Sequence, residues 1–174
     1  MKYSVLKAAA LAALCLGFFS SGTKAQSNDH YGCTDAALKG DYAFTVSGTI
    51  WVKDPQGNLE TIQREGIAMT HFDGKGGLSQ VDYVLSGLNG LPTPPPPPTD
   101  PLTGFHIMES GTYQVYSDCT GTFTIDSPGT TITVKFVLSN HGRGIHTIVT
   151  SLVGPNGPIT ALIRSEGHKL GKLE

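Results

Sequence analysis

The 174-residue sequence lacks most of the features that mark well-known functional sites. It has only three cysteines with no Cys-x-x-Cys pair, and no cluster of basic residues that would bind a nucleic-acid backbone. Its glycines are scattered at turns and form no phosphate-binding loop between a strand and a helix. Ser110, Ser127 and Ser165 have no nucleophile-elbow motif around them, so the sequence does not indicate a Ser-His-Asp hydrolase.

Apolar residues run without interruption only near the N-terminus. Lys2 and Lys7 precede an apolar segment over residues 8–19, and small residues lead up to Ala25. This order of residues is typical of a secretory signal peptide. The apolar segment itself is too short to span a bilayer. We expect residues 1–25 to be removed and the mature chain to be exported to the periplasm or the extracellular space, with no membrane span. Its nine Lys and Arg against fourteen Asp and Glu give a formal net charge of −5, which again disfavours nucleic acid.

Two cysteines remain after this processing, Cys33 and Cys119. In an oxidising compartment we expect them to form a disulfide, and two buried free thiols are the alternative. The closed loop of about 87 residues would stabilise the fold by about 4 to 5 kcal/mol in the chain-entropy model.

Residues 26–40 predict a polar lead that ends in one short helix over 34–40. Thr34 is placed to cap the helix and Gly40 to end it in a left-handed conformation, while Leu38 is expected to point inward as a plug.

The rest of the mature chain, residues 41–170, alternates apolar and polar residues with the period of β-strands. Short turns such as 73–77 and 127–129 separate the segments. Eight sequential strands without a crossover helix predict an all-β fold, a single antiparallel up-and-down eight-stranded β-barrel, with a β-sandwich as the alternative. The predicted strands are 41–52, 59–72, 78–85, 103–116, 122–126, 130–139, 145–152 and 159–166.

One connection is long: the loop 87–102 holds seven of the eleven prolines. Pro94 to Pro98 predict a stiff polyproline II segment that cannot join a sheet. A lid over the barrel, a docking segment and a tolerated surface insertion all remain open as interpretations of this loop.

Three stretches carry a resemblance to a known family. They are Cys33-x4-Leu38-x-Gly40-x-Tyr42-x-Phe44, the turn 72–76, and the segment 110–122 with its Asp-Cys-Thr-Gly-Thr motif. Over most of the mature chain the sequence resembles small exported bacterial proteins of the allene oxide cyclase barrel-like, calycin-type family. This resemblance implies an eight-stranded barrel. Plant allene oxide cyclases bind and cyclise an oxidised fatty acid inside such a barrel, but no catalytic residue transfers to a position in this chain.

Two predicted inward-facing rows contain one charged residue each, Arg64 in the row 62–72 and Glu109 in the row 107–115. A closed barrel of eight strands is just wide enough to hold one small ligand. We predict that both residues face a partly hollow interior, where Glu109 acts as an acid or base or Arg64 binds a ligand carboxylate. A position at the rim in water, or a structural pair, is the alternative. The small residues expected to leave space are Gly48, Gly66, Ala68 and Gly111.

We expect no cofactor and no metal ion. His141 and His146 flank a turn, and together with His71 or His106 their spacing matches no closed metal site. The predicted ligand-binding residues are Glu109, Arg64, Tyr113, Phe44 and Phe72.

The leading functional prediction is an exported barrel that binds a small, largely apolar ligand in its cavity. One alternative is a cofactor-free cyclase or isomerase with Glu109 as its acid or base. The other is an interaction module that works as a homo-oligomer through outward-facing apolar residues. Those residues are Trp51, Ile67, Met69 and Val137.

Overall fold

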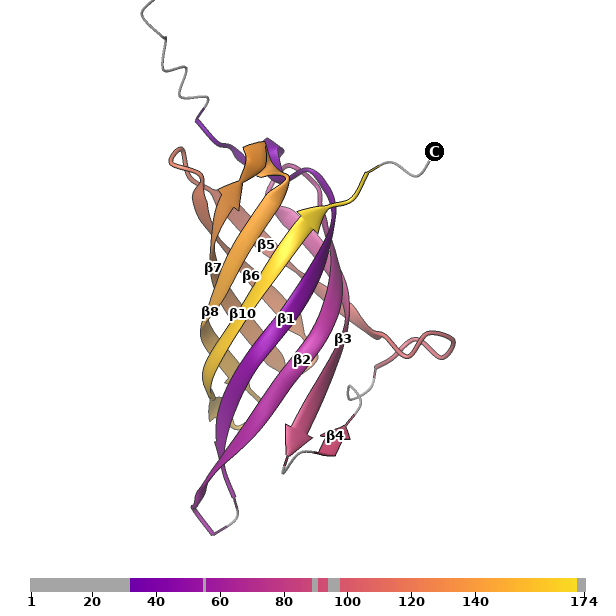
Figure 1. Ribbon diagram of the computed structural model, residues 1–174, viewed down its shortest axis with the longest axis vertical. Helices are drawn as coiled ribbons and strands as arrows, with labels where there is room; N and C mark the ends of the chain where they lie inside the picture. The colour runs from indigo at the N-terminus through magenta and orange to yellow at the C-terminus, as the bar shows by residue number, and fades with distance from the viewer. Residues whose placement is uncertain (1–31, 55, 89–90, 94–97, 172–174) are drawn as a thin grey trace, which may run out of the picture. The chain divides into compact units, whose positions relative to one another are not determined.

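The computed structural model describes residues 32–54, 56–88, 91–93 and 98–171 (Figure 1). The predicted signal peptide and Pro94 to Pro97 lie outside these described residues. Within them, the two helices are single 3-10 turns, and no helix is long and apolar enough to cross a membrane.

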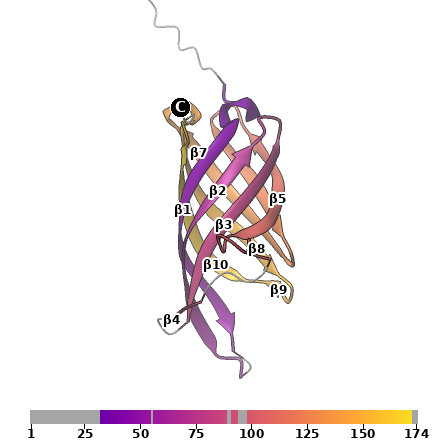
Figure 2. The same ribbon diagram turned by 90° about the vertical axis from the view of Figure 1, so that its right-hand side faces the viewer.

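Eight long strands follow one another around a closed barrel (Figures 1 and 2). Each pairs antiparallel with the next, and the last strand pairs with both the first and the seventh long strand. This closure confirms the predicted eight-stranded up-and-down barrel and excludes the sandwich. The strands are β1 (Gly40–Lys53), β2 (Leu59–Phe72), β3 (Gly77–Leu88), β5 (His106–Val115), β6 (Thr120–Ser127), β7 (Thr130–Ser139), β8 (Gly144–Gly154) and β10 (Thr160–Lys169).

The alternation in β2 shows why the sequence folds this way. Ala68 and Thr70 are buried, whereas Ile67 and Met69, which alternate with them, are about half exposed, at 51% and 48%. Successive side chains of a strand point to opposite faces, so one set lines the interior and the other covers the outside. β2 and β7 have the predicted bounds, while β3 runs three residues further than predicted, and β5 starts three residues later.

Two short strands add to the ends of long ones. β4 (Leu91–Thr93) pairs with β3, and β9 (Gly157–Pro158) pairs with β8. Part of the proline-rich loop therefore does join the sheet, just before the run of prolines. Pro92 is tolerated because β4 is a short edge strand, where a missing N–H costs little.

A single 3-10 turn, η1 (Asp35–Leu38), plugs one end of the barrel. Leu38 is fully buried, as predicted. The Asp35 carboxylate accepts a hydrogen bond of 2.7 Å from the Val115 amide, which fixes η1 to β5. The predicted cap is wrong in detail: Thr34 makes no side-chain cap, because its backbone carbonyl bonds the Ala37 amide instead, and Gly40 with φ +125° already belongs to β1.

The same end holds a second 3-10 turn, η2 (Asn140–Gly142), and a tightly packed aromatic core. The hydroxyl of the fully buried Tyr42 donates to the Gly142 carbonyl. Phe72 packs edge-on against Tyr42 and Tyr113, with ring centroids 5.4 Å and 5.0 Å apart. These contacts pack the interior near η1.

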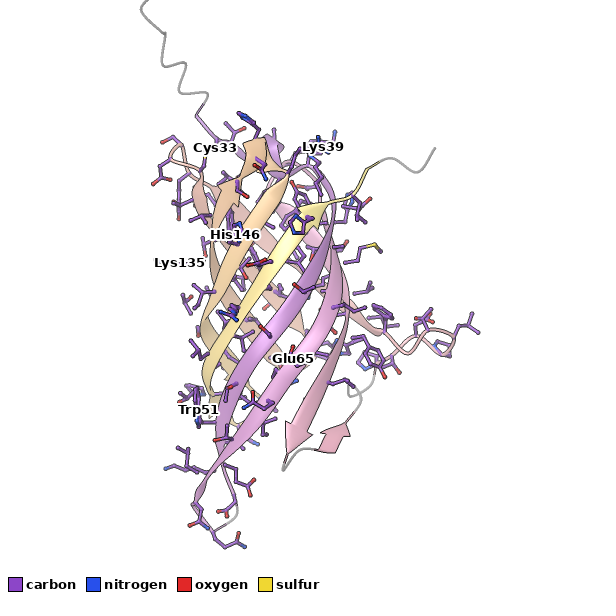
Figure 3. The ribbon with its side chains drawn as sticks, viewed as in Figure 1. Cys33, Lys39, Trp51, Glu65, Lys135 and His146 are labelled. Carbon is purple, nitrogen blue, oxygen red and sulfur yellow. A yellow bond between two sulfur atoms is a disulfide. The ribbon has the colours of Figure 1, made fainter. Side chains whose placement is uncertain are left out.

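The predicted disulfide is present. Cys33 bonds Cys119, which occupies the turn between β5 and β6 with φ +67°. The Cys33 amide also donates to the Ser117 carbonyl at 3.3 Å. The disulfide therefore fastens the segment that precedes the plug to the rim of the barrel (Figure 3).

We expect replacement of both Cys33 and Cys119 by serine to lower the free energy of unfolding by about 3 to 5 kcal/mol, since a long loop is released in the unfolded chain. Urea denaturation followed by circular dichroism measures this change. Dithiothreitol should lower the stability of the native protein by a similar amount and leave the double variant unaffected. An unchanged urea midpoint for the double variant would show that the bond adds no stability.

Candidate ligand-binding cavity

The interior of the barrel contains a partly open cavity of about 210 Å³ whose two walls differ in polarity. Strands β2, β3 and β5 contribute the charged and amide side chains, and β6, β7, β8 and β10 contribute most of the apolar ones. The main polar residues are Arg64, Gln80, Asp82, His106 and Glu109. The main apolar residues on the facing wall are Phe123, Ile125, Val134, Val149, Leu152 and Ile163.

Glu109 is held by a row of hydrogen bonds across three strands. Thr70 on β2 is opposite Gln80 on β3, which is opposite Glu109 on β5. The Thr70 hydroxyl donates to the Gln80 carbonyl oxygen at 2.7 Å, and the Gln80 amide donates to Glu109 Oε2 at 2.8 Å. Only 4% of the Glu109 side chain is exposed. The row fixes the carboxylate and leaves Oε1 available to other groups.

A β-bulge brings His106 to the same inner face as Glu109. Gln80 pairs with Glu109, but Asp82 pairs with His106, so two residues of β5 oppose the single residue Val81. His106 Nδ1 lies 3.0 Å from Glu109 Oε1 and 3.8 Å from Asp82 Oδ1. In a regular strand, residues three apart would point to opposite faces.

The predicted inward row of β5 is therefore wrong at one position. Ile107 lines a groove on the outside of the barrel, and His106 takes the inner position. Strict two-residue alternation cannot detect this reversal, so it could not place His106 on the cavity wall. Asp82 follows the regular alternation of β3 and was not singled out as a cavity residue. The signal in the sequence is His106-Ile-Met-Glu109, two polar residues three apart in a strand, which meet only if the strand bulges.

Arg64 lies on the cavity wall, as does Glu109, so the structure brings together the two charged residues that the sequence singled out. The Arg64 Nε atom is buried and makes no hydrogen bond. Burial lowers the pKa of the guanidinium, and the charge of Asp82 opposes this shift. Ligand binding by Arg64 and Glu109 stays a prediction.

Asp82 has a strongly perturbed carboxyl group. Burial, together with the charge of the nearby Glu109, raises its pKa to about 7 against the opposing effects of His106 and Arg64. The side chain is 18% exposed. Two carboxylates close together in a poorly solvated site do not ionise independently.

The other predicted ligand-binding residues divide into two groups. Phe44 lines the cavity. Phe72 and Tyr113 do not, because they belong to the packed aromatic core next to η1, where the Tyr113 hydroxyl donates to the Asp35 carbonyl at 3.1 Å.

The inner glycines were predicted to leave space in the barrel, but they serve a different purpose. A Cβ atom at Gly111 would lie 1.8 Å from the Thr124 carbonyl oxygen, and one at Gly48 would lie 2.3 Å from the Leu162 carbonyl oxygen. Neighbouring backbone, not empty space, occupies these positions. The glycines permit close approach between strands, as is common where a barrel wall bends.

His71, His141 and His146 do not line the cavity. His71 contacts Asp41 at 2.7 Å and His146 lies 3.6 Å from Glu166, and both are at least half exposed (Figure 3 labels His146). His141 lies in η2. The structure thus does not bring His141, His146 and His71 together.

An apolar groove of about 660 Å³ lies on the outer face, where β1, β2 and β3 meet the segment 98–107. Two of the predicted outward-facing residues, Ile67 and Met69, line it. Val137 is 48% exposed, and Trp51 is partly buried.

Comparison with known proteins adds little to this description. No protein-family model matches the chain, and no curated protein matches it. A solved structure, that of Rv2717c from M. tuberculosis, aligns with 78% of this chain and 94% of its own, at 9% identity and a TM-score of 0.28. Likeness at this level carries no conclusion about function. Membership of the allene oxide cyclase barrel-like family stays a prediction.

We expect Asp82→Asn to stabilise the protein increasingly as the pH rises from about 4 to about 7. The unfolded carboxyl ionises near pH 4, whereas the folded one stays neutral up to about pH 7. Over this window the wild type should lose up to about 1.4 kcal/mol of stability per pH unit relative to the variant. Urea denaturation of both proteins in metal-free buffer measures the difference.

Asp73→Asn is the control of opposite sign. The amides of Lys75 and Gly77 donate to Asp73 and lower its pKa, so its contribution to stability is present near neutral pH and is lost as the pH falls through the folded-state pKa. An Asp82→Asn effect that does not depend on pH would contradict the environment described for Asp82.

Proposed function

We propose that the barrel binds one compact, largely apolar molecule in its interior, with a polar group of the ligand at the wall formed by β2, β3 and β5. The observation that carries this proposal is the partly open interior cavity of about 210 Å³, which has the charged and amide side chains on one wall and a mainly apolar facing wall. Ligand pockets generally combine an apolar lining with a few polar groups that orient the ligand.

The volume limits the size of the ligand. An apolar cavity of about 150 Å³ holds a molecule of benzene. A cavity of about 210 Å³ therefore suits one ring with a small substituent, and it is too small for a long-chain fatty acid. The aromatic core beside η1 prevents the cavity from extending toward that end.

The polar wall favours a hydrogen-bond donor on the ligand. Asp82 and Glu109 present two carboxyl groups to the cavity against the single guanidinium of Arg64. A neutral hydroxyl can donate to a carboxyl oxygen of either residue, whereas a ligand carboxylate would be repelled wherever one of these acidic groups is ionised. We therefore expect neutral hydrogen-bond donors to bind better than carboxylates. This differs from the prediction made from Arg64 alone, which was a ligand carboxylate.

We also infer that the protein works outside the cytoplasm. The disulfide between Cys33 and Cys119 supports this location, because such bonds persist in oxidising compartments. The cyclase or isomerase activity and the homo-oligomer remain predictions, and neither is needed for ligand binding.

Small one-ring probes test the size and polarity of the cavity. We expect phenol to bind more tightly than toluene and both to bind more tightly than benzoate, with no interior binding of palmitate. Val149→Phe should reduce phenol affinity at least tenfold because its larger side chain fills the cavity. Isothermal titration calorimetry in metal-free buffer measures each affinity.

Val153→Phe is the matched control, since Val153 is 39% exposed on the same strand, β8, and does not line the cavity. Ile163→Phe repeats the test from β10 if the first variant does not fold. Equal phenol affinity in the Val149→Phe and Val153→Phe variants would show that the cavity is not the binding site. Native mass spectrometry before and after denaturation then gives the mass of any ligand retained from the exporting host.

A further inference from the structure

Asp82, His106 and Glu109 form the one group of three or more potential metal ligands found among the described residues. Each offers one ligand atom, and these atoms all lie within 4.8 Å of one another. We propose that these three side chains bind a divalent transition-metal ion on the polar wall of the cavity. This inference does not depend on the proposed binding of an apolar ligand.

The donor set suits such an ion. One imidazole nitrogen and two carboxylate oxygens are common ligands of zinc, manganese and iron, whereas calcium and magnesium prefer oxygen alone. Ligand atoms around a zinc ion at about 2.1 Å lie about 3 to 3.5 Å from one another. The distances from His106 Nδ1 to Glu109 Oε1 and Asp82 Oδ1 are 3.0 Å and 3.8 Å, so only small side-chain movements are needed.

The backbone holds the three residues in place. Asp82 and His106 are direct cross-strand partners on β3 and β5, and the bulge turns His106 to the side of Glu109. Outside this set, Gln80 donates to Glu109 and is itself bonded by Thr70. Hydrogen bonds of this kind orient metal-ligating carboxylates and leave their other oxygen free to bind.

Charge also favours a cation at this position. Asp82 and Glu109 repel each other in a buried site, and a dication between them would offset that repulsion. Arg64 is the opposing group, because its positive charge interacts with Asp82. We therefore expect Arg64 to weaken metal binding, and its removal to strengthen it.

The cavity leaves room to complete the coordination. Three protein ligands with one or more open positions are typical of metal sites that also hold water or a substrate. All three side chains line the cavity of about 210 Å³, so the open positions would face the interior.

Titration of the metal-free full chain with zinc chloride tests the site. Calorimetry should give one zinc ion per chain for the wild type, and Glu109→Gln and His106→Gln should each bind at least tenfold more weakly. Arg64→Gln should bind at least threefold more tightly, an effect that general destabilisation of the barrel would not produce. His71→Gln is the control, because His71 forms a comparable pair with Asp41 on the exposed surface and should leave the affinity unchanged.

Cobalt(II) supplies an independent readout. Visible absorption bands of a bound cobalt ion should appear with the wild type and change with His106→Gln. No zinc binding by the wild type, or equal weakening by His71→Gln and His106→Gln, would overturn the proposal. Phenol binding in the presence of EDTA tests the cavity function separately, because phenol binding requires no metal. Failure of the metal site can therefore be told apart from failure of the cavity function.

Discussion

Closure of the sheet, through the pairing of β10 with both β1 and β8, is the constraint on which the rest of the structure depends. It removes the long exposed edges that would otherwise pair with other chains. It also creates one continuous inner surface, to which every second residue of a strand belongs wherever the ladder is regular. The size of the inner side chains decides whether the barrel is filled or hollow.

The two regions of the interior are built differently. Beside η1, Leu38 and the aromatic rings of Tyr42, Phe72 and Tyr113 fill the space, and the disulfide holds the preceding segment in place. Further along, shorter apolar side chains face polar ones across a cavity. The carboxylates, imidazole and guanidinium on this wall are costly to bury, so they are more readily explained by binding than by stability alone.

Much of the fold could be predicted from alternation and turn residues, which report on each strand locally. β2 and β7, the cysteine pair and the buried Leu38 were predicted correctly, and Arg64 and Glu109 both reach the cavity. Alternation alone could not predict the bulge, because the bulge is a mismatch between two strands; the one indication in the sequence is the pair of polar residues His106 and Glu109, three apart. As a result Ile107 was placed on the inner face where His106 lies. Separately, the inner glycines were interpreted as space although they permit strands to approach closely.

The candidate site requires the bulge in β5, so its most direct test is the register between β3 and β5. Cross-strand nuclear Overhauser effects in the isotopically labelled protein measure this register residue by residue. We expect contacts of the Asp82 backbone with His106 beyond the regular pair Gln80–Glu109. Contacts of Asp82 with Ile107 instead would mean a regular ladder, would move His106 to the outer surface, and would contradict both the described polar wall and the metal site.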